Sequence, residues 1–143
     1  MFSNSTKYAI KAVLYLAVHS SEQHKIVIND IAEPINVPKA YLAKLLQELS
    51  RQSIISSTKG LKGGFYLSNK DRERNIKDII DVIDGEDRLN SCLLSLKDCD
   101  SKNPCSLHHL AYSQKQIILD NFKSKSLNDL AMHLKSGKSV LPL

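Results

Sequence analysis

Cysteine is scarce in this chain, and long hydrophobic runs are absent. The 143 residues include three cysteines, an odd number without the paired spacing of secreted disulfide-linked proteins, so we expect a reducing compartment, the cytoplasm. No run approaches the roughly 18 apolar residues of a membrane-spanning helix, and we expect no membrane insertion. The chain also lacks a Gly-x-x-x-x-Gly-Lys-[Ser/Thr] nucleotide loop and an evident nucleophile arrangement, which argues against an enzyme.

Charge is distributed unevenly along the chain. The net charge is +5; residues 1–80 carry 12 Lys or Arg against 7 Asp or Glu, whereas residues 81–143 carry 8 of each. A basic half beside a neutral half suggests that the first half binds a polyanion, although a solvated positive surface gives the same excess. The 42% hydrophobic content suffices for one ordinary domain, or for a small domain with an appended dimerisation element.

Apolar spacing and capping residues in the first half predict a helix, a turn and a second helix after an initial helix. Pro34 ends the middle helix, and Pro38 suits the first position of the last one. The three predicted helices run from a cap at Ser5 or Thr6 to about His19, from a cap at Asn29 through Ala32, and from Pro38 to about Gln52.

The last of these helices has two different faces. Its leucines predict a buried stripe, and small and basic residues occupy the opposite face. Such a face permits close approach to a DNA major groove while Lys and Arg meet phosphates or guanine edges, although an ordinary solvated face looks similar. The stripe is Leu42, Leu45, Leu46 and Leu49, and the opposite face is Ala40, Lys44, Gln47 and Arg51.

A glycine-rich hairpin is predicted next. Residues 54–58 and 65–67 have strand character, and the segment Lys59-Gly60-Leu61-Lys62-Gly63-Gly64 joins them. Glycines let a backbone come close to DNA, and the two lysines can contact phosphates or enter a minor groove; the alternative is a plain hairpin turn. The combination predicts a DNA-binding wing. The expected DNA contacts are Pro38, Lys39, Ala40, Tyr41, Lys44, Arg51, Lys59, Gly60, Lys62, Gly63 and Gly64.

The second half predicts three more helices. Asn75 caps the first, which has a stripe of isoleucines and ends at Gly85. A long helix from about Cys105 to Asn121 carries an apolar seam that calls for a partner, and Ser126 with Asp129 starts a short final helix. The seam is Leu107, Leu110, Ala111, Gln114, Ile117, Ile118 and Phe122.

The expected fold is mainly α with a small β-hairpin wing, a winged helix-turn-helix domain followed by a long dimerisation helix. The winged domain spans 1–84, a cysteine-bearing loop spans 85–106, and the dimerisation helix with a C-terminal helix and tail spans 107–143.

The three cysteines, Cys92, Cys99 and Cys105, share one loop. If Cys105 opens the long helix, either His108 or His109 can lie on its face and complete a Cys3His ligand set. Thiolates select zinc, copper(I) or iron–sulfur clusters. The alternative is three unconnected reduced thiols.

Over nearly its whole length the chain resembles the Rrf family of bacterial winged-helix regulators. The resemblance rests on Lys7-Tyr8-Ala9, Asp30-Ile31-Ala32, Tyr41-Leu42 with Leu45 and Leu49, Lys59-Gly60 to Gly63-Gly64-Phe65, and the three cysteines.

The resemblance implies a cytoplasmic homodimer that binds double-stranded DNA at a palindromic operator. It also implies a 2Fe–2S cluster held by Cys92, Cys99, Cys105 and His108, as in the IscR-like and NsrR-like subclass, through which the regulator senses iron–sulfur status, redox or nitric oxide. His109 stays open as the alternative fourth ligand.

The chain departs from the family pattern in three places. The gap between Cys92 and Cys99 is one residue longer, Lys7 occupies the place of an aspartate ligand in NsrR-like proteins, and Lys59 replaces the usual wing arginine. The main alternative function is a metal-free, thiol- or metabolite-responsive regulator. A structural zinc site and an iron–sulfur carrier are weaker alternatives, since the chain has no Cys-x-x-Cys knuckle and a carrier leaves the basic winged half unexplained.

Overall fold

The computed structural model describes residues 2–94 and 100–142. These residues form seven helices and one antiparallel hairpin. This confirms the predicted fold class, mainly helical with a small hairpin. In chain order the elements are α1 (Asn4–His19), α2 (Ile28–Ala32), α3 (Lys39–Arg51), β1 (Ser56–Thr58), β2 (Gly64–Tyr66), α4 (Asn69–Arg72), α5 (Ile76–Asp84), α6 (His108–Ser124) and α7 (Leu127–Lys135).

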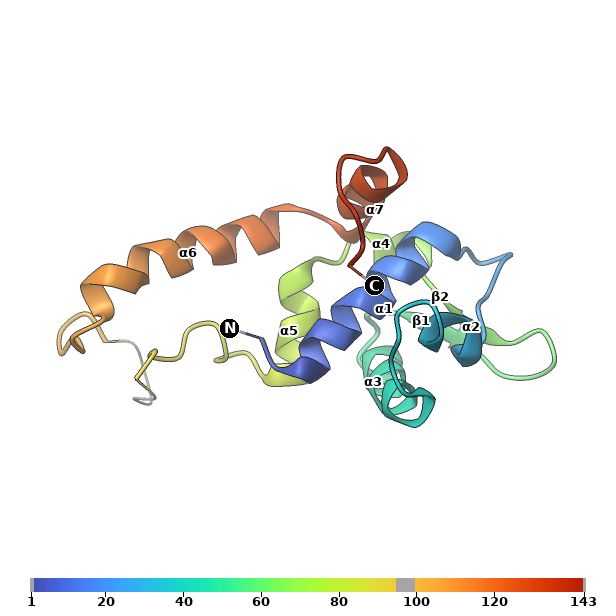
Figure 1. Cartoon of the computed structure of the whole chain (residues 1–143), viewed down its shortest axis with the longest axis horizontal. Coiled ribbons are helices and arrows are strands. Elements are labelled where there is room, and N and C mark those ends of the chain that lie inside the picture. Colours follow the sequence, from blue (N-terminus) through green and yellow to red (C-terminus); the bar gives the residue numbers. More distant parts are fainter. Residues whose placement is uncertain (1, 95–99, 143) are drawn as a thin grey trace.

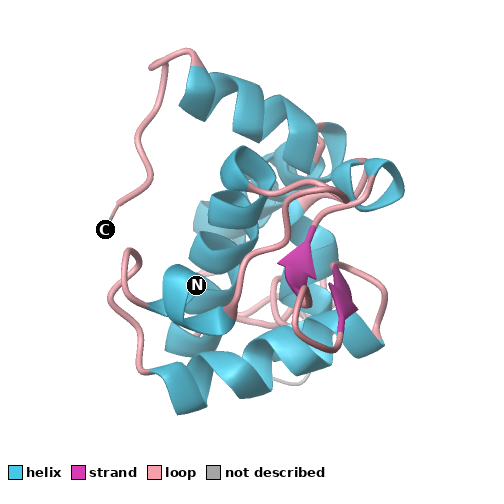
Figure 2. Cartoon of the chain, turned by 90° about the vertical axis from the view of Figure 1, so that its right-hand side faces the viewer, coloured by secondary structure: helices cyan, strands magenta, loops and turns pink. Residues whose placement is uncertain are grey.

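Helix α1 is the centre of the core. Its inward residues have no exposed surface, and α3, α5 and α7 pack around it (Figure 1). Small residues on this face let the neighbouring helices approach closely. The hairpin lies at one side of this helical group, as Figure 2 shows. The fully buried residues of α1 are Thr6, Ala9, Ala12, Val13, Leu16 and Ala17.

Two predicted caps are confirmed and two are wrong. Asn75 and Ser126 each form a capping box, with Asp78 and Asp129 respectively. Helix α1, however, is capped by Ser3, whose hydroxyl accepts from the Thr6 backbone N–H. The predicted cap Asn29 lies inside α2, which begins after an extended Val27 without a side-chain cap.

The hairpin is shorter than predicted and is tied to the core. Strand β1 starts at Ser56, where pairing with Tyr66 of the second strand begins, and the buried Ile54 and Ile55 precede it. Strand β2 starts at Gly64, and Phe65 exchanges two backbone hydrogen bonds of 2.9 Å with Ile26. The chain then forms the unpredicted helix α4, which a capping box stabilises.

Helix α6 begins at His108 rather than at Cys105 and ends at Ser124 rather than at Asn121. Residues 105–107 form a turn in which the His108 backbone N–H donates to the Cys105 carbonyl at 3.0 Å. The helix extends away from the winged domain (Figure 1), and the chain returns through α7, whose Leu127 and Ala131 join the core beside α1. Within the described ranges, no helix has the length and apolarity needed to cross a membrane.

Candidate nucleic-acid interface and cysteine site

Helix α3 has the two faces expected of it. All four leucines of the predicted stripe are buried, because they close the core against α1 and α5. The opposite face is solvent-exposed, as are Pro38, Lys39 and Tyr41 at its start. DNA contact by these residues stays a prediction. The exposed face is Ala40, Lys44, Gln47 and Arg51.

Two contacts hold the exposed polar groups of α3 in place. The Tyr41 hydroxyl hydrogen-bonds the Ser5 hydroxyl, and its ring meets the Tyr8 ring edge-on at 5.8 Å between centroids. Arg51 pairs with Glu48 one turn earlier, which partly offsets its charge. Positive charge available to a phosphate on this helix is therefore concentrated on Lys39 and Lys44.

The hairpin loop presents Lys59, Gly60 and Lys62 to solvent. Gly63 and Gly64 are closely surrounded by backbone atoms of the protein itself, which leave no room for a Cβ atom. A Cβ at Gly63 would lie 2.3 Å from the Thr58 carbonyl oxygen, and one at Gly64 would lie 2.8 Å from the Ile26 carbonyl oxygen. Both glycines are thus required by the turn and by the bridge to Ile26, and their predicted contact with DNA stays a prediction.

Two of the three cysteines lie together. The Cys92 and Cys105 sulfur atoms are 3.4 Å apart, with Cys92 buried and Cys105 half-buried. Cys99 falls outside the described residues. Within residues 2–94 and 100–142, no group of three or more His, Cys, Asp or Glu side chains is placed to hold a metal ion.

The two candidate histidines differ in their surroundings. His108 is 7% exposed and stacks on Tyr112 at 4.7 Å, whereas His109 is exposed. His108 and Cys105 line the same small cavity with Leu93 and Lys115. His108 is thus the histidine that shares a cavity with Cys105, and its role as a ligand stays a prediction.

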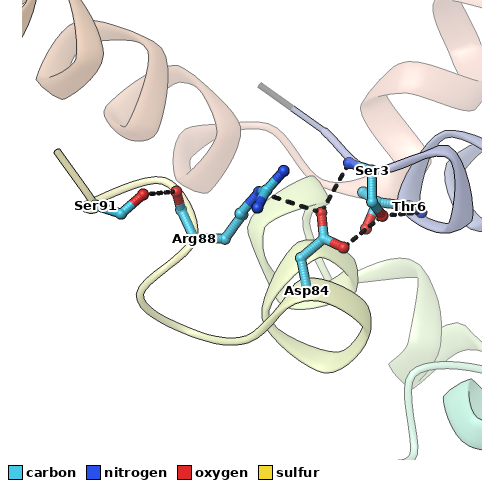
Figure 3. Close-up of polar contacts among 5 residues, drawn as sticks. All are labelled: Ser3, Thr6, Asp84, Arg88 and Ser91. Atoms are coloured by element: carbon cyan, nitrogen blue, oxygen red, sulfur yellow. Dashed lines mark hydrogen bonds and ion pairs between the residues drawn. The ribbon is translucent and has the colours of Figure 1, made fainter. Parts of the chain in front are cut away.

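The segment that contains the cysteines, residues 85–106, is called the cysteine segment. A set of polar contacts that the sequence did not predict joins its start to the winged domain (Figure 3). The Ser3 backbone N–H and hydroxyl both donate to Asp84, and the Arg88 guanidinium lies 3.9 Å from the same carboxylate. Burial alone raises the pKa of Asp84, but the Ser3 hydroxyl and backbone hydrogen bonds outweigh it and lower the pKa below the ordinary value.

The same segment contacts α6. The Lys115 ammonium donates to the Ser91 carbonyl, and Ser91 in turn donates through its hydroxyl to the Arg88 carbonyl at 2.9 Å. A cavity of about 470 Å³ lies between this segment and α6, lined by Cys92, Leu93, Ile118 and other residues. The cysteine segment therefore touches both the winged domain and the long helix.

The sequence model of the Rrf2 family, described as "Iron-dependent Transcriptional regulator", matches residues 2–133. An Aquifex aeolicus protein provisionally named an HTH-type transcriptional regulator is 34% identical over 91% of this chain and 90% of its own length. The HTH-type transcriptional regulator NsrR of Bacillus licheniformis is 26% identical over 97% of both chains. IscR of Vibrio cholerae is 27% identical over 88% of this chain and 74% of its own.

Solved structures support the same fold. The global cysteine regulator CymR of B. subtilis superposes with a TM-score of 0.75 at 20% identity, covering 93% of this chain and 97% of its own. IscR of T. potens gives a TM-score of 0.71 at 21% identity, covering 98% and 92%. The named relatives are transcriptional regulators and not enzymes. The chain thus belongs to the Rrf2 family of winged-helix, DNA-binding transcription regulators.

Proposed function

We propose that this regulator senses iron–sulfur status, redox or nitric oxide through a 2Fe–2S cluster bound by Cys92, Cys99, Cys105 and His108. The observation that carries the proposal is the 3.4 Å approach of the Cys92 and Cys105 sulfurs beside the buried His108. The two cysteines are 13 positions apart in the sequence, so their approach is not imposed by local backbone geometry.

The donor set suits the group. Cysteine thiolates and imidazole nitrogen are ligands that iron–sulfur clusters use, and a histidine ligand raises the reduction potential relative to an all-cysteine site. A bound cluster supplies an electron-transfer centre that reacts with oxygen and nitric oxide. The chain's own residues would hold it beside α6, where Cys105 and His108 line one cavity with Leu93 and Tyr112.

Contacts on both sides of the cysteine segment support a coupling to DNA binding. On one side Ser91 accepts from Lys115 of α6. On the other side Arg88 pairs with Asp84, which accepts a hydrogen bond from Ser3, the N-cap of α1. Ser5, in the first turn of α1, hydrogen-bonds Tyr41 of α3. A rearranged cysteine segment would shift α3 relative to α6, and with it the affinity for DNA.

The α6 surface supports a homodimer on a palindromic operator. Leu110 and Ile117 lie on one side of α6 and are 75% and 54% exposed. Pairing this seam with a second copy covers the apolar side chains and places two α3 helices at a fixed separation, which a palindromic site matches.

Purification without oxygen, followed by visible absorption and analysis of iron, sulfide and zinc, tests the cluster. Visible bands with equal iron and sulfide support it. A colourless protein that contains zinc, or no metal even after anaerobic reconstitution, would contradict it and leave the family assignment intact.

A metal-free thiol regulator is the second candidate, because the same sulfur approach suits oxidation. Cys92 and Cys105 would lose two electrons and two protons to a peroxide and form a disulfide, closing their sulfurs to about 2.05 Å. Peptide mapping of metal-free protein after peroxide treatment detects that bond. A Cys92–Cys105 disulfide that changes DNA affinity, in protein that cannot be reconstituted with iron and sulfide, favours this candidate.

A further inference from the structure

The wing carries an apolar side chain at its tip. Leu61 has a relative exposure of 108%, more than any other exposed apolar side chain of the described residues. Its neighbours Lys59 and Lys62 are also exposed. In Figure 1 the loop between β1 and β2 projects from the body of the domain. Single exposed leucines are common on protein surfaces, but this one stands between two exposed lysines at the tip of a projecting hairpin.

The loop backbone presents this leucine in a defined way. The Gly63 backbone N–H donates to the Gly60 carbonyl at 3.0 Å, and Gly60 has φ +102°, a conformation that favours glycine. The hairpin base is held to Ile26 by the bridge at Phe65. The tip therefore leaves the domain as a short turn on an anchored base.

We propose that Leu61 inserts into the DNA minor groove as an apolar wedge between base steps, while the flanking lysines meet the phosphates on either side. Apolar wedges that partly unstack a step are a known means of minor-groove binding. The two lysines give the tip a positive charge, which attracts the negatively charged DNA backbone. The inference deepens the DNA-binding function and rests on it.

Two short duplexes test the groove. Alternating inosine–cytosine and guanine–cytosine duplexes differ in the guanine amino group, which lies in the minor groove. We expect the wild type to bind the inosine duplex more tightly, and Leu61→Ser to lose about fivefold in affinity for that duplex by removing an apolar contact. Leu61→Met should keep the preference, because methionine also serves as a wedge.

Two control variants separate the wedge from charge and from general effects. Lys62→Ala should weaken binding to both duplexes equally, because phosphates are common to both. Val140→Ser alters another exposed apolar residue, in the C-terminal tail, and should leave the affinity for both duplexes unchanged.

Unstacking gives a second readout. In a third duplex, 2-aminopurine replaces the adenine of a central thymine–adenine step, and its fluorescence rises when the base unstacks. Saturating wild type should raise this fluorescence, while saturating Leu61→Ser should not. If the wild type binds both duplexes but Leu61→Ser retains its preference and its fluorescence rise, the Leu61 inference alone is overturned. If the wild type binds neither duplex, DNA binding by the winged domain fails with it.

Discussion

Ser3 and Asp84 join two helix ends that are 81 residues apart in the chain. The Ser3 backbone N–H donates to Asp84 Oδ2 at 3.1 Å, its hydroxyl donates to Oδ1, and the same hydroxyl accepts from the Thr6 N–H. One carboxylate therefore fixes the cap of α1 against the end of α5, at the point where the cysteine segment begins.

The pH dependence of stability follows from this contact. Because the folded pKa of Asp84 is lowered, its stabilising effect is present above the unfolded pKa of about 3.9 and is lost as pH falls through the folded pKa. We expect Asp84→Asn to cost about 1 kcal/mol at pH 7, after allowing for solvent near the carboxylate. Urea unfolding at pH 7 and near pH 3 should show the difference from wild type shrinking in acid.

Glu22→Gln is the matched control for Asp84→Asn, because Glu22 is exposed in the turn after α1. It should leave stability unchanged at both pH values. A constant deficit of Asp84→Asn across this range would mean that the charge of Asp84 does not contribute.

The ligand proposal predicts different effects for the adjacent histidines. His108→Ala should lower cluster occupancy at least about tenfold under limiting iron and sulfide, since it removes a proposed ligand. His109→Ala, on the exposed neighbour, should leave iron content and the visible spectrum unchanged. The reverse pattern would transfer the ligand role to His109, and equal spectra would remove histidine from the site.

The α6 seam predicts the oligomeric state. Ile117→Lys places a charge where the proposed pairing is apolar and should weaken self-association at least about tenfold. Sedimentation velocity over a concentration series measures the change. Asn128→Lys, at an exposed position of α7 and off the α6 seam, is the charge-matched control and should keep the wild-type association. Identical behaviour of the two variants would place the interface elsewhere.

Phosphate contacts predict the salt dependence of DNA binding. Lys44→Ala should weaken binding to all duplexes and lower the slope of log affinity against log salt by about one per chain. Lys135→Ala, at the exposed end of α7, should change neither affinity nor slope. An unchanged slope for Lys44→Ala would mean that its ammonium does not meet a phosphate.

Local patterns predicted the helices well where the determinants are close in sequence. Asn75 with Asp78, and Ser126 with Asp129, form caps from residues three apart. The leucine stripe of α3 follows from helical periodicity alone. The start of α1 was missed because Ser3, Ser5 and Thr6 are all able to cap, and the choice of Ser3 also involves Asp84, far along the chain.

The candidate site was less predictable from the sequence because its contacts also join residues far apart in the chain. The Ser5–Tyr41 and Ser3–Asp84 bonds, and the contact of Lys115 with Ser91, join residues that have no pattern in common. In α6 the buried apolar residue is Leu119, which the predicted seam omitted, because packing against α5 rather than periodicity determines the inward face. The cysteines could be grouped from sequence, but only the structure separates His108 from His109 by burial.

The packing of α7 against α1 affects the order of folding during synthesis. Helix α1 is synthesised well before Leu127 and Ala131, which complete the core around it. Contacts between such distant segments close late, because the intervening chain must be ordered first. The apolar face of α1 is therefore incompletely covered until α7 has been synthesised, and a nascent chain that stops before α7 exposes the centre of its own core.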